Sequence, residues 1–202
     1  MKRITLALTG ASGMAYGLRL LECLLRAGCQ VDLLISQAAR IVAKQELDLQ
    51  LPIGNAEVAA FFDARYGEYG GRLTAYGKEE WFAPAASGSN PAAAMVVCPC
   101  TMGTLGRIAH GYSEDVLLRA ADVVLKERKK LILVPRETPL SLIHVKNMEL
   151  LLLAGATLIP ANPSFYSGAK TIIELVDTVV ARVLDHIGVE NKLAPRWIEE
   201  KE

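Results

Sequence analysis

Short apolar runs alternate with longer amphipathic stretches along most of the chain. The runs are almost continuously apolar, a pattern typical of strands that are buried on both faces. The longer stretches repeat apolar side chains every three or four residues, as Leu18, Leu21 and Leu24 do. We therefore predict strands and helices in alternation, with the clearest strands at 4–8, 31–35, 95–98, 131–134 and 156–159.

Residues that favour helix ends bound several of the predicted helices. Ser36 is expected to cap the helix at 37–45. Ser113 is expected to cap the helix at 113–128, with Glu114 and Asp115 in its first turn. The other predicted helices lie at 15–27, 101–109, 141–153 and 171–187. The less regular region 47–92 is expected to hold a helix near 56–62, a short strand near 73–76 and a loop over 81–91.

This alternation predicts an α/β fold, in which helices cover both faces of a parallel sheet. We expect three αβα layers around about six strands, formed as one domain over 1–202. The polar tail 189–202 is expected to contribute to the site or to subunit contacts. Ligands of such sheets lie beyond the carboxyl ends of the strands. The expected site segments are therefore 9–13, 36, 98–104, 135–138 and 160–166.

Charge and hydropathy limit the partners that this chain can have. Its 202 residues hold 22 basic and 22 acidic side chains, so bulk charge gives no support for nucleic-acid binding. A neutral chain with a mean hydropathy of +0.26 is expected to cover apolar surface with other subunits. No apolar run has the length of a secretory or membrane segment, and the four cysteines lack disulfide or zinc spacing. We expect a cytoplasmic protein with reduced thiols and without a metal.

The segment after the first strand combines small residues with the start of a helix. Gly10, Ala11, Ser12 and Gly13 would let a phosphate-bearing ligand approach the backbone. Their spacing is not that of a dinucleotide fingerprint, and Ser36 stands where a dinucleotide binder usually has an acidic residue. A phosphate-bearing mononucleotide therefore fits better than NAD. The alternative is a glycine turn with a purely structural role.

Two further strand ends carry groups that can bind anions or move protons. The residues 101–104 offer two hydroxyl groups and a glycine at a helix start, as a second cradle or as an ordinary helix cap. Arg136 can clamp a phosphate, and Glu137 beside it can transfer protons, unless the two form only a local ion pair. The hydroxyl groups and the charged pair both fall on the predicted ligand-binding edge.

Several residues elsewhere remain open to two interpretations. Lys126 and Arg182 are helical cations, which in isolation are typical of solvated helix surfaces. Two prolines stiffen the loop that presents Tyr166. The loop that begins at Trp81 is either a flexible connection or a cover for the site.

Together these motifs resemble the UbiX-type flavin prenyltransferases over nearly the whole chain. The resemblance rests on the motifs TGASG at 9–13, ASGS at 86–89, CPCTMGT at 98–104, RAADVVLKER at 119–128 and PRETP at 135–139. It implies a Rossmann- or flavodoxin-like fold and a metal-independent enzyme that joins a dimethylallyl group to N5 and C6 of reduced FMN. The product, prenylated FMN, serves UbiD-type decarboxylases in ubiquinone or aromatic-acid metabolism. The resemblance also implies a homo-oligomer, a dodecamer, with sites between subunits and no role for nucleic acid or membranes.

The resemblance assigns roles to individual residues. It implies that FMN contacts Gly10, Ala11, Ser12, Ser36, Thr101, Met102, Gly103, Thr104 and Arg136, and that a neighbouring subunit supplies Ser87, Gly88, Ser89 and Asn90. Dimethylallyl phosphate would be held by Tyr166, Arg182, Lys126 and Arg136, with Trp81 and Trp197 around the prenyl group. Glu137 and Ser12 are the implied catalytic residues, Glu137 as the acid and base. The chain departs from the family at Glu114 and Asp115, and at Thr101, which keeps the hydroxyl group of the more usual serine.

Two other functions compete with prenyl transfer. A flavin-dependent decarboxylase on the same scaffold would use a catalytic histidine and a loop that contains asparagine, whereas His110 and His144 match no such position. A flavin carrier would store FMN without chemistry, but simple binding needs fewer charges than Lys126, Arg136, Arg182 and Glu137 provide. Whether the prenyl donor is a monophosphate or a pyrophosphate stays open at this point.

Overall fold

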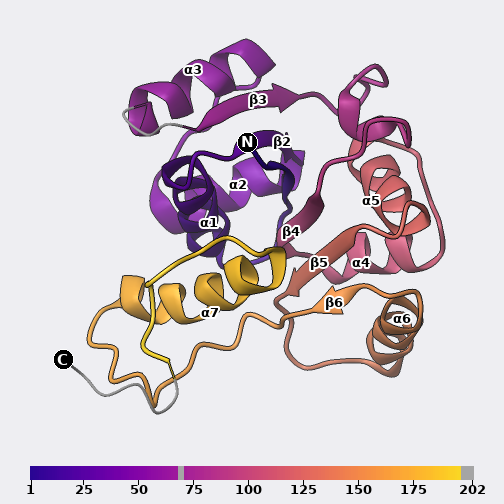
Figure 1. The fold of residues 1–202 in the computed structure, drawn as a ribbon. Coiled ribbons are helices and arrows are strands. Elements are labelled where there is room, and N and C mark those ends of the chain that lie inside the picture. The colour runs from indigo at the N-terminus through magenta and orange to yellow at the C-terminus, as the bar shows by residue number, and fades with distance from the viewer. Residues whose placement is uncertain (68–70, 197–202) are drawn as a thin grey trace.

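The computed structural model describes residues 1–67 and 71–196, which form one six-stranded parallel sheet (Figure 1). The strand order is β3-β2-β1-β4-β5-β6, the doubly wound order of Rossmann folds. The predicted α/β class with six strands is confirmed. The strands are β1 (Arg3–Leu8), β2 (Gln30–Ile35), β3 (Arg72–Tyr76), β4 (Ala94–Cys100), β5 (Lys130–Pro135) and β6 (Thr157–Leu158).

The predicted helices are present, with small shifts at their ends. In the loop predicted at 81–91 the structure adds a single 3-10 turn, η1 (Pro84–Ala86). The helices are α1 (Met14–Arg26), α2 (Gln37–Leu47), α3 (Asn55–Tyr66), α4 (Met102–Ala109), α5 (Val116–Lys126), α6 (Leu142–Leu153) and α7 (Ile172–Ile187).

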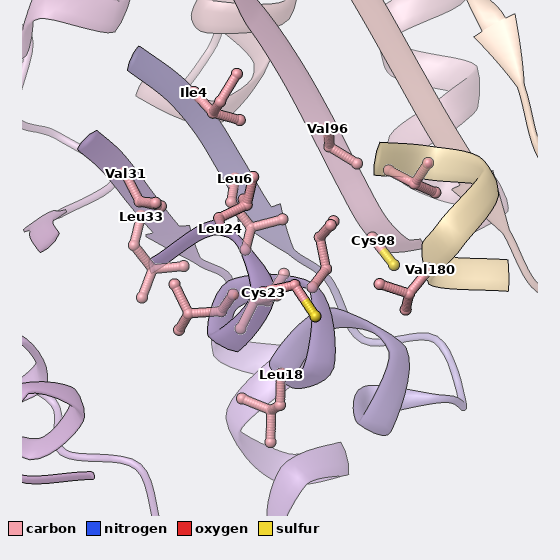
Figure 2. Packing of buried hydrophobic residues seen from close by; sticks show 14 of the residues in the cluster. Ile4, Leu6, Leu18, Cys23, Leu24, Val31, Leu33, Val96, Cys98 and Val180 are labelled. Atoms are coloured by element: carbon pink, nitrogen blue, oxygen red, sulfur yellow. The ribbon is translucent and has the colours of Figure 1, made fainter. Parts of the chain in front are cut away.

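Two apolar clusters fill the space between the sheet and its helices. One joins one sheet face to α1, α2, α3 and α7, and the other joins the opposite face to α4, α5 and α6. Figure 2 shows Leu6 and Val96 of the sheet beside Leu24 of α1 and Val180 of α7. Because β1 and β4 are covered on both faces, they are apolar almost without interruption.

The helix caps agree with the sequence at Ser36 and differ at Ser113. The Ser36 hydroxyl accepts from the amide of Ala39, as expected of a residue that caps the start of a helix. The expected cap at Ser113 is wrong, because α5 begins later and the Asp115 carboxylate accepts from the amide of Leu118. Asp115 therefore precedes the first turn of α5 instead of lying within it.

Helix α6 carries apolar side chains on its outer side as well as its inner side, although it packs on one side only. Of its residues only Asn147 and Leu151 are buried. Its exposed apolar side chains are Leu142, Ile143, Val145, Leu150, Leu152 and Leu153. Surface helices normally turn polar side chains outward, so this face is unusual for an isolated subunit. Within the described ranges, no helix has the length and apolar character needed to cross a membrane.

The two edges of the sheet, where the strands begin and where they end, are called here the amino edge and the carboxyl edge. The loops after β1 and β4 leave the carboxyl edge at the switch in strand order, where ligands bind in such sheets. Helices α5 and α7 run back from it. Lys2 and Lys130, at the amino edge, donate to the carbonyl groups of Ile187 and His186 at the end of α7.

Candidate functional site

Thr9 ties the ends of β1 and β4 together at the switch point. Its hydroxyl donates to the carbonyl of Pro99 at 2.8 Å and accepts from the amide of Thr101 at 2.9 Å. Thr9 is 1% exposed, so both bonds are shielded from water. The loops that follow the two strands are therefore held in a fixed relation to each other.

The loop 10–13 needs its glycines for backbone reasons. A Cβ atom at Gly10 would lie 2.4 Å from the Cβ of Ala38, because α2 begins directly against the loop. Gly13 has a φ of 102°, which side chains disfavour. The structural role that the sequence left open is therefore real. It leaves Ser12 exposed at the surface of the loop, next to the buried Ala11.

Glu46, in the last turn of α2, is a site residue that the sequence did not reveal. Its carboxylate accepts from the amides of Gly13 and Met14 at 2.9–3.0 Å and from the hydroxyl of Ser12. The amides of Gly13 and Met14 at the start of α1 are therefore already hydrogen-bonded within the chain. No motif marks Glu46, because it meets the loop only through the packing of α2 on α1.

The electrostatics at Glu46 link the loop to Arg136. Burial disfavours the charged carboxylate, but the hydrogen bonds from Ser12, Met14 and Gly13 and the charge of Arg136 outweigh it, so the pKa of Glu46 lies below its ordinary value. Ser12, Glu46 and Arg136 thus form one constellation, called here the Ser12–Glu46–Arg136 group. It joins the ends of β1, α2 and β5.

The predicted second cradle lies beside this group. The Thr101 hydroxyl caps α4 by accepting from the amide of Thr104, and it donates to the Thr104 hydroxyl at 2.9 Å. Cys100 is paired with Pro135 in the sheet, which brings Thr101 next to Arg136. The cap alternative is confirmed here, and the capping hydroxyls still face the carboxyl edge. Met102 is buried, whereas Gly103 is exposed.

Glu137 extends from the carboxyl edge into solvent. Its side chain is exposed, and its Oε1 atom accepts from the amide of Thr138 at 3.2 Å. No ion pair between Arg136 and Glu137 is found among the described contacts. The local ion-pair alternative for these two residues is therefore not what the structure shows.

A cleft of about 830 Å³ opens at the carboxyl ends of β2 and β3. Its wall includes Ser36, Arg40, Tyr76 and Lys78. The volume lies in the range of pockets that hold cofactor-sized molecules. Ser36 joins this cleft to the loop at Gly10, since that loop packs against the start of α2.

Four of the other expected binding residues lie together at the amino edge. Ser87, Ser89 and Asn90 lie in the turn before β4, and Lys126 lies at the end of α5, just before β5. The turn and the helix end touch, because a Cβ atom at Gly88 would lie 2.6 Å from Nζ of Lys126. Lys126 pairs with Glu127.

The strands separate these residues from the carboxyl edge within one subunit. Strands of six or seven residues span roughly 20 Å at about 3.3 Å per residue. Lys126 therefore cannot reach the surroundings of Arg136 on its own subunit. Arg182 lies nearly three turns along α7, roughly 16 Å from its start, and pairs with Asp185 at 3.6 Å. The three cations expected around the phosphate are thus apart in a single chain.

The expected aromatic residues have different surroundings. Trp81 lies in the exposed loop before η1, and Tyr166 is 70% exposed in the loop that follows β6. Trp197 lies outside the described residues. The part of the tail up to Arg196 packs against α7, where Arg196 pairs with Asp185 at 2.5 Å.

The two histidines considered for a decarboxylase make contacts that hold helices in place. His110 lies 3.1 Å from the Asn147 amide oxygen and so links α4 to α6. His144 completes the capping box of α6 with Ser141. Over residues 1–67 and 71–196, no group of three or more acidic, histidine or cysteine side chains could hold a metal ion.

Comparison with known proteins gives a consistent picture. The model of the Flavoprotein family matches residues 1–184. The chain is 47% identical over 199 residues to the flavin prenyltransferase UbiX of Pseudomonas aeruginosa, covering 98% of this chain and 95% of that protein.

Two solved structures are also similar. A UbiX complexed with FMN and dimethylallyl pyrophosphate has a TM-score of 0.87 at 37% identity, covering 99% of both chains. A dodecameric FMN-dependent UbiX-like decarboxylase from Escherichia coli has a TM-score of 0.83 at 37% identity, covering 98% of this chain and all of that one. Because the family model covers most of its length and a flavin prenyltransferase is 47% identical to it over 98% of the chain, the chain belongs to the UbiX-type flavin prenyltransferases.

Proposed function

We propose that this protein transfers a dimethylallyl group from dimethylallyl phosphate to N5 and C6 of reduced FMN. The product would be prenylated FMN, the cofactor of UbiD-type decarboxylases. The observation that carries the proposal is the Ser12–Glu46–Arg136 group beside the exposed Glu137, in a chain 47% identical to a flavin prenyltransferase. The relative complexed with dimethylallyl pyrophosphate supports the prenyl donor class.

The residues of the carboxyl edge fit FMN. Backbone and hydroxyl donors from 10–12, Ser36 and 101–104 surround the switch point, and Arg136 supplies a positive charge for a phosphate or an anionic ring. FMN supplies the nucleophilic N5 and C6 atoms. The Glu46 carboxylate holds the Ser12 hydroxyl, which we propose orients the ring at N5. Because Glu46 is fixed by two backbone amides, Ser12 is held before the ligand arrives.

Glu137 is proposed to carry the protons of the reaction. The allylic C–O bond breaks and phosphate leaves with its electron pair, while bonds from the prenyl group to N5 and C6 form. Of the two protons released from these atoms, one goes to the prenyl double bond and the other to the departing phosphate. The exposed Glu137 carboxyl beside Arg136 can accept and return such a proton.

We propose that each site is completed by neighbouring subunits. Ser87, Ser89 and Lys126 lie about one strand length from Arg136, so only another copy can bring them to the flavin. Tyr166, Arg182, Trp81 and Trp197 are proposed to hold the prenyl phosphate in the same shared site. Cations would then stabilise the leaving phosphate in the role that a metal ion takes elsewhere. The dodecameric relative and the exposed apolar face of α6 support an oligomer.

We further propose one domain over 1–202, with the tail 189–202 at the site or at a subunit contact. Val189 and Leu193 pack onto the core that includes α7, which supports this role for the first part of the tail. A cytoplasmic location is proposed as well. It is supported by four free, buried cysteines, an arrangement typical of reducing compartments.

Phosphate release tests this function against its competitors. With reduced FMN and dimethylallyl phosphate under anaerobic conditions, we expect one inorganic phosphate to be released per FMN consumed. A flavin carrier or a decarboxylase would release none. Repeating the measurement with dimethylallyl pyrophosphate, and assaying pyrophosphate, identifies the preferred donor.

A further inference from the structure

The turn that carries Ser87 and Ser89 is clamped at both ends by arginine side chains. Nε of Arg119 donates to the carbonyl of Ala86 at 3.2 Å, on the side before the turn. The guanidinium of Arg3 donates to the carbonyl of Asn90, at the end of the turn. Residues 87–90 are called here the amino-edge turn.

Each clamping arginine is held by a carboxylate. Arg119 pairs with Asp122 at 2.6 Å, one turn further along α5. Arg3 pairs with Asp32 at 3.4 Å across the two neighbouring strands β1 and β2. The second pair is the more unusual one, because the Asp32 side chain is 0% exposed and the Arg3 side chain is 17% exposed.

Asp32 stands where the sheet favours an apolar residue. Its sheet partner Thr5 is also fully buried, and no described residue donates a hydrogen bond to either Asp32 oxygen or pairs with the Thr5 hydroxyl. A buried ion pair of this kind contributes little stability, since desolvation offsets the attraction between the charges. The pair therefore calls for a role other than holding the fold together.

The geometry of Arg3 supplies that role. Its carbonyl accepts from the amide of Ala93 at 2.9 Å, so the side chain of Arg3 holds the end of the turn and its main chain holds the segment that follows. Within the turn, the Ser87 and Ser89 hydroxyls lie 2.9 Å apart. Gly88 abuts Lys126, so a shift of the turn would also move this cation.

We propose that Arg3, oriented by the buried Asp32, is a positioning residue that sets the amino-edge turn for use in the site of a neighbouring subunit. Arg3 and Asp32 touch neither flavin nor prenyl donor in this arrangement. They act through Ser87, Ser89 and Lys126. The inference rests on the proposed function, because that function gives the turn its task.

The test removes both members of the pair at once. Removing only one would leave a buried charge and could unfold the protein, whereas Arg3→Met with Asp32→Leu replaces the pair by apolar side chains and leaves no unpaired charge. We expect the thermal midpoint to be maintained, amide exchange at 87–92 to become faster, and KM for FMN to rise by about tenfold. The matched control is Arg72→Met, at an exposed position that starts β3, and it should leave all three unchanged.

Mixed oligomers separate positioning in trans from a structural effect within one subunit. The double variant keeps Glu137, and a Glu137→Gln subunit keeps an intact amino-edge turn. In a random mixture of equal amounts, about a quarter of the sites should combine Glu137 from one subunit with an intact amino-edge turn from its neighbour. These sites should show the wild-type KM for FMN. An unchanged KM in the double variant, or mixed oligomers without rescue, would overturn the proposal.

A failure of the proposed function has a different signature. If the wild-type protein forms no prenylated flavin, the proposed function fails before any variant is compared. The role of Arg3 and Asp32 in holding the amino-edge turn (called the clamp) is then still tested by FMN affinity, measured from flavin fluorescence, and by amide exchange. Weakened FMN binding with a loosened turn in the double variant supports the clamp, and unchanged values for both reject it.

Discussion

At the scale of single residues, the site depends on side chains that hold other side chains. Thr9 fixes two loops through one hydroxyl, and Glu46 fixes Ser12 while it occupies two helix-start amides. Arg136 and Glu137 could be predicted from the sequence, because they directly follow a strand. Glu46 could not, since its importance comes from the packing of α2 against the loop at Ser12.

Glu137→Gln tests the proton carrier. The amide keeps the size of the side chain but cannot accept and return a proton, so FMN binding should persist while prenylation slows by about 100- to 10,000-fold. FMN affinity from fluorescence and turnover from flavin mass measure the two effects. Glu149→Gln, on the exposed side of α6, is the control. Wild-type turnover in Glu137→Gln would remove Glu137 from the mechanism.

Glu46→Gln tests the anchor of the glycine loop through its pH dependence. Because the folded-state pKa of Glu46 lies below its ordinary value of 4.5, the ionised carboxylate stabilises the fold above about pH 4.5. That contribution is lost as the pH falls through the lowered folded-state pKa. The free energy of unfolding of wild type should therefore exceed that of the variant near pH 7, and the gap should shrink below about pH 4.5. Urea titrations at several pH values measure it, and a gap that does not vary with pH would contradict this role.

At the scale of elements, the hydrophobic pattern predicted every strand and helix, because each contributes apolar side chains to one of two continuous clusters. Helix ends were less certain. Ser113 and Asp115 are both good capping residues, and only the path of the backbone decides between them. The amide of Val116 donates to the carbonyl of Lys78, which fixes the start of α5 after Asp115.

The cap of α5 gives a paired prediction. Asp115→Ala should lower the free energy of unfolding by about 1 kcal/mol, because the amide of Leu118 loses its acceptor. Ser113→Ala should leave it unchanged. Urea unfolding of both variants measures the difference. Equal losses in the two variants would show that the helix starts earlier than described.

At the scale of the whole molecule, the fold shows where the apolar surface expected from the sequence lies. Helix α6 directly follows the loop with Arg136 and Glu137, and six of its exposed side chains are apolar. The sequence indicated oligomerisation, but it could not show that Lys126 and Arg136 lie at opposite edges of the sheet. Strand order and the path of α5 and α7 appear only in the fold. With Lys126 in the site as proposed, its distance from Arg136 makes the oligomer a condition for activity.

Disrupting the α6 face should separate the subunits and abolish turnover together. Ile143→Glu with Leu153→Glu places charges at positions that are 72% and 80% exposed in the single chain, so the subunit should still fold. Light scattering should show smaller particles, and prenylation should fall below detection. Lys146→Gln on the same helix is the control. If the double variant still assembled fully, the subunit contacts would lie elsewhere than on the outer face of α6.

The central claim is that this protein prenylates FMN, and the mass of the flavin tests it most directly. The protein is incubated with reduced FMN and dimethylallyl phosphate without oxygen, and the flavin is then analysed by mass spectrometry. The account predicts that FMN gains the mass of one five-carbon prenyl unit. Recovery of unmodified FMN, with protein that binds both compounds, would contradict it.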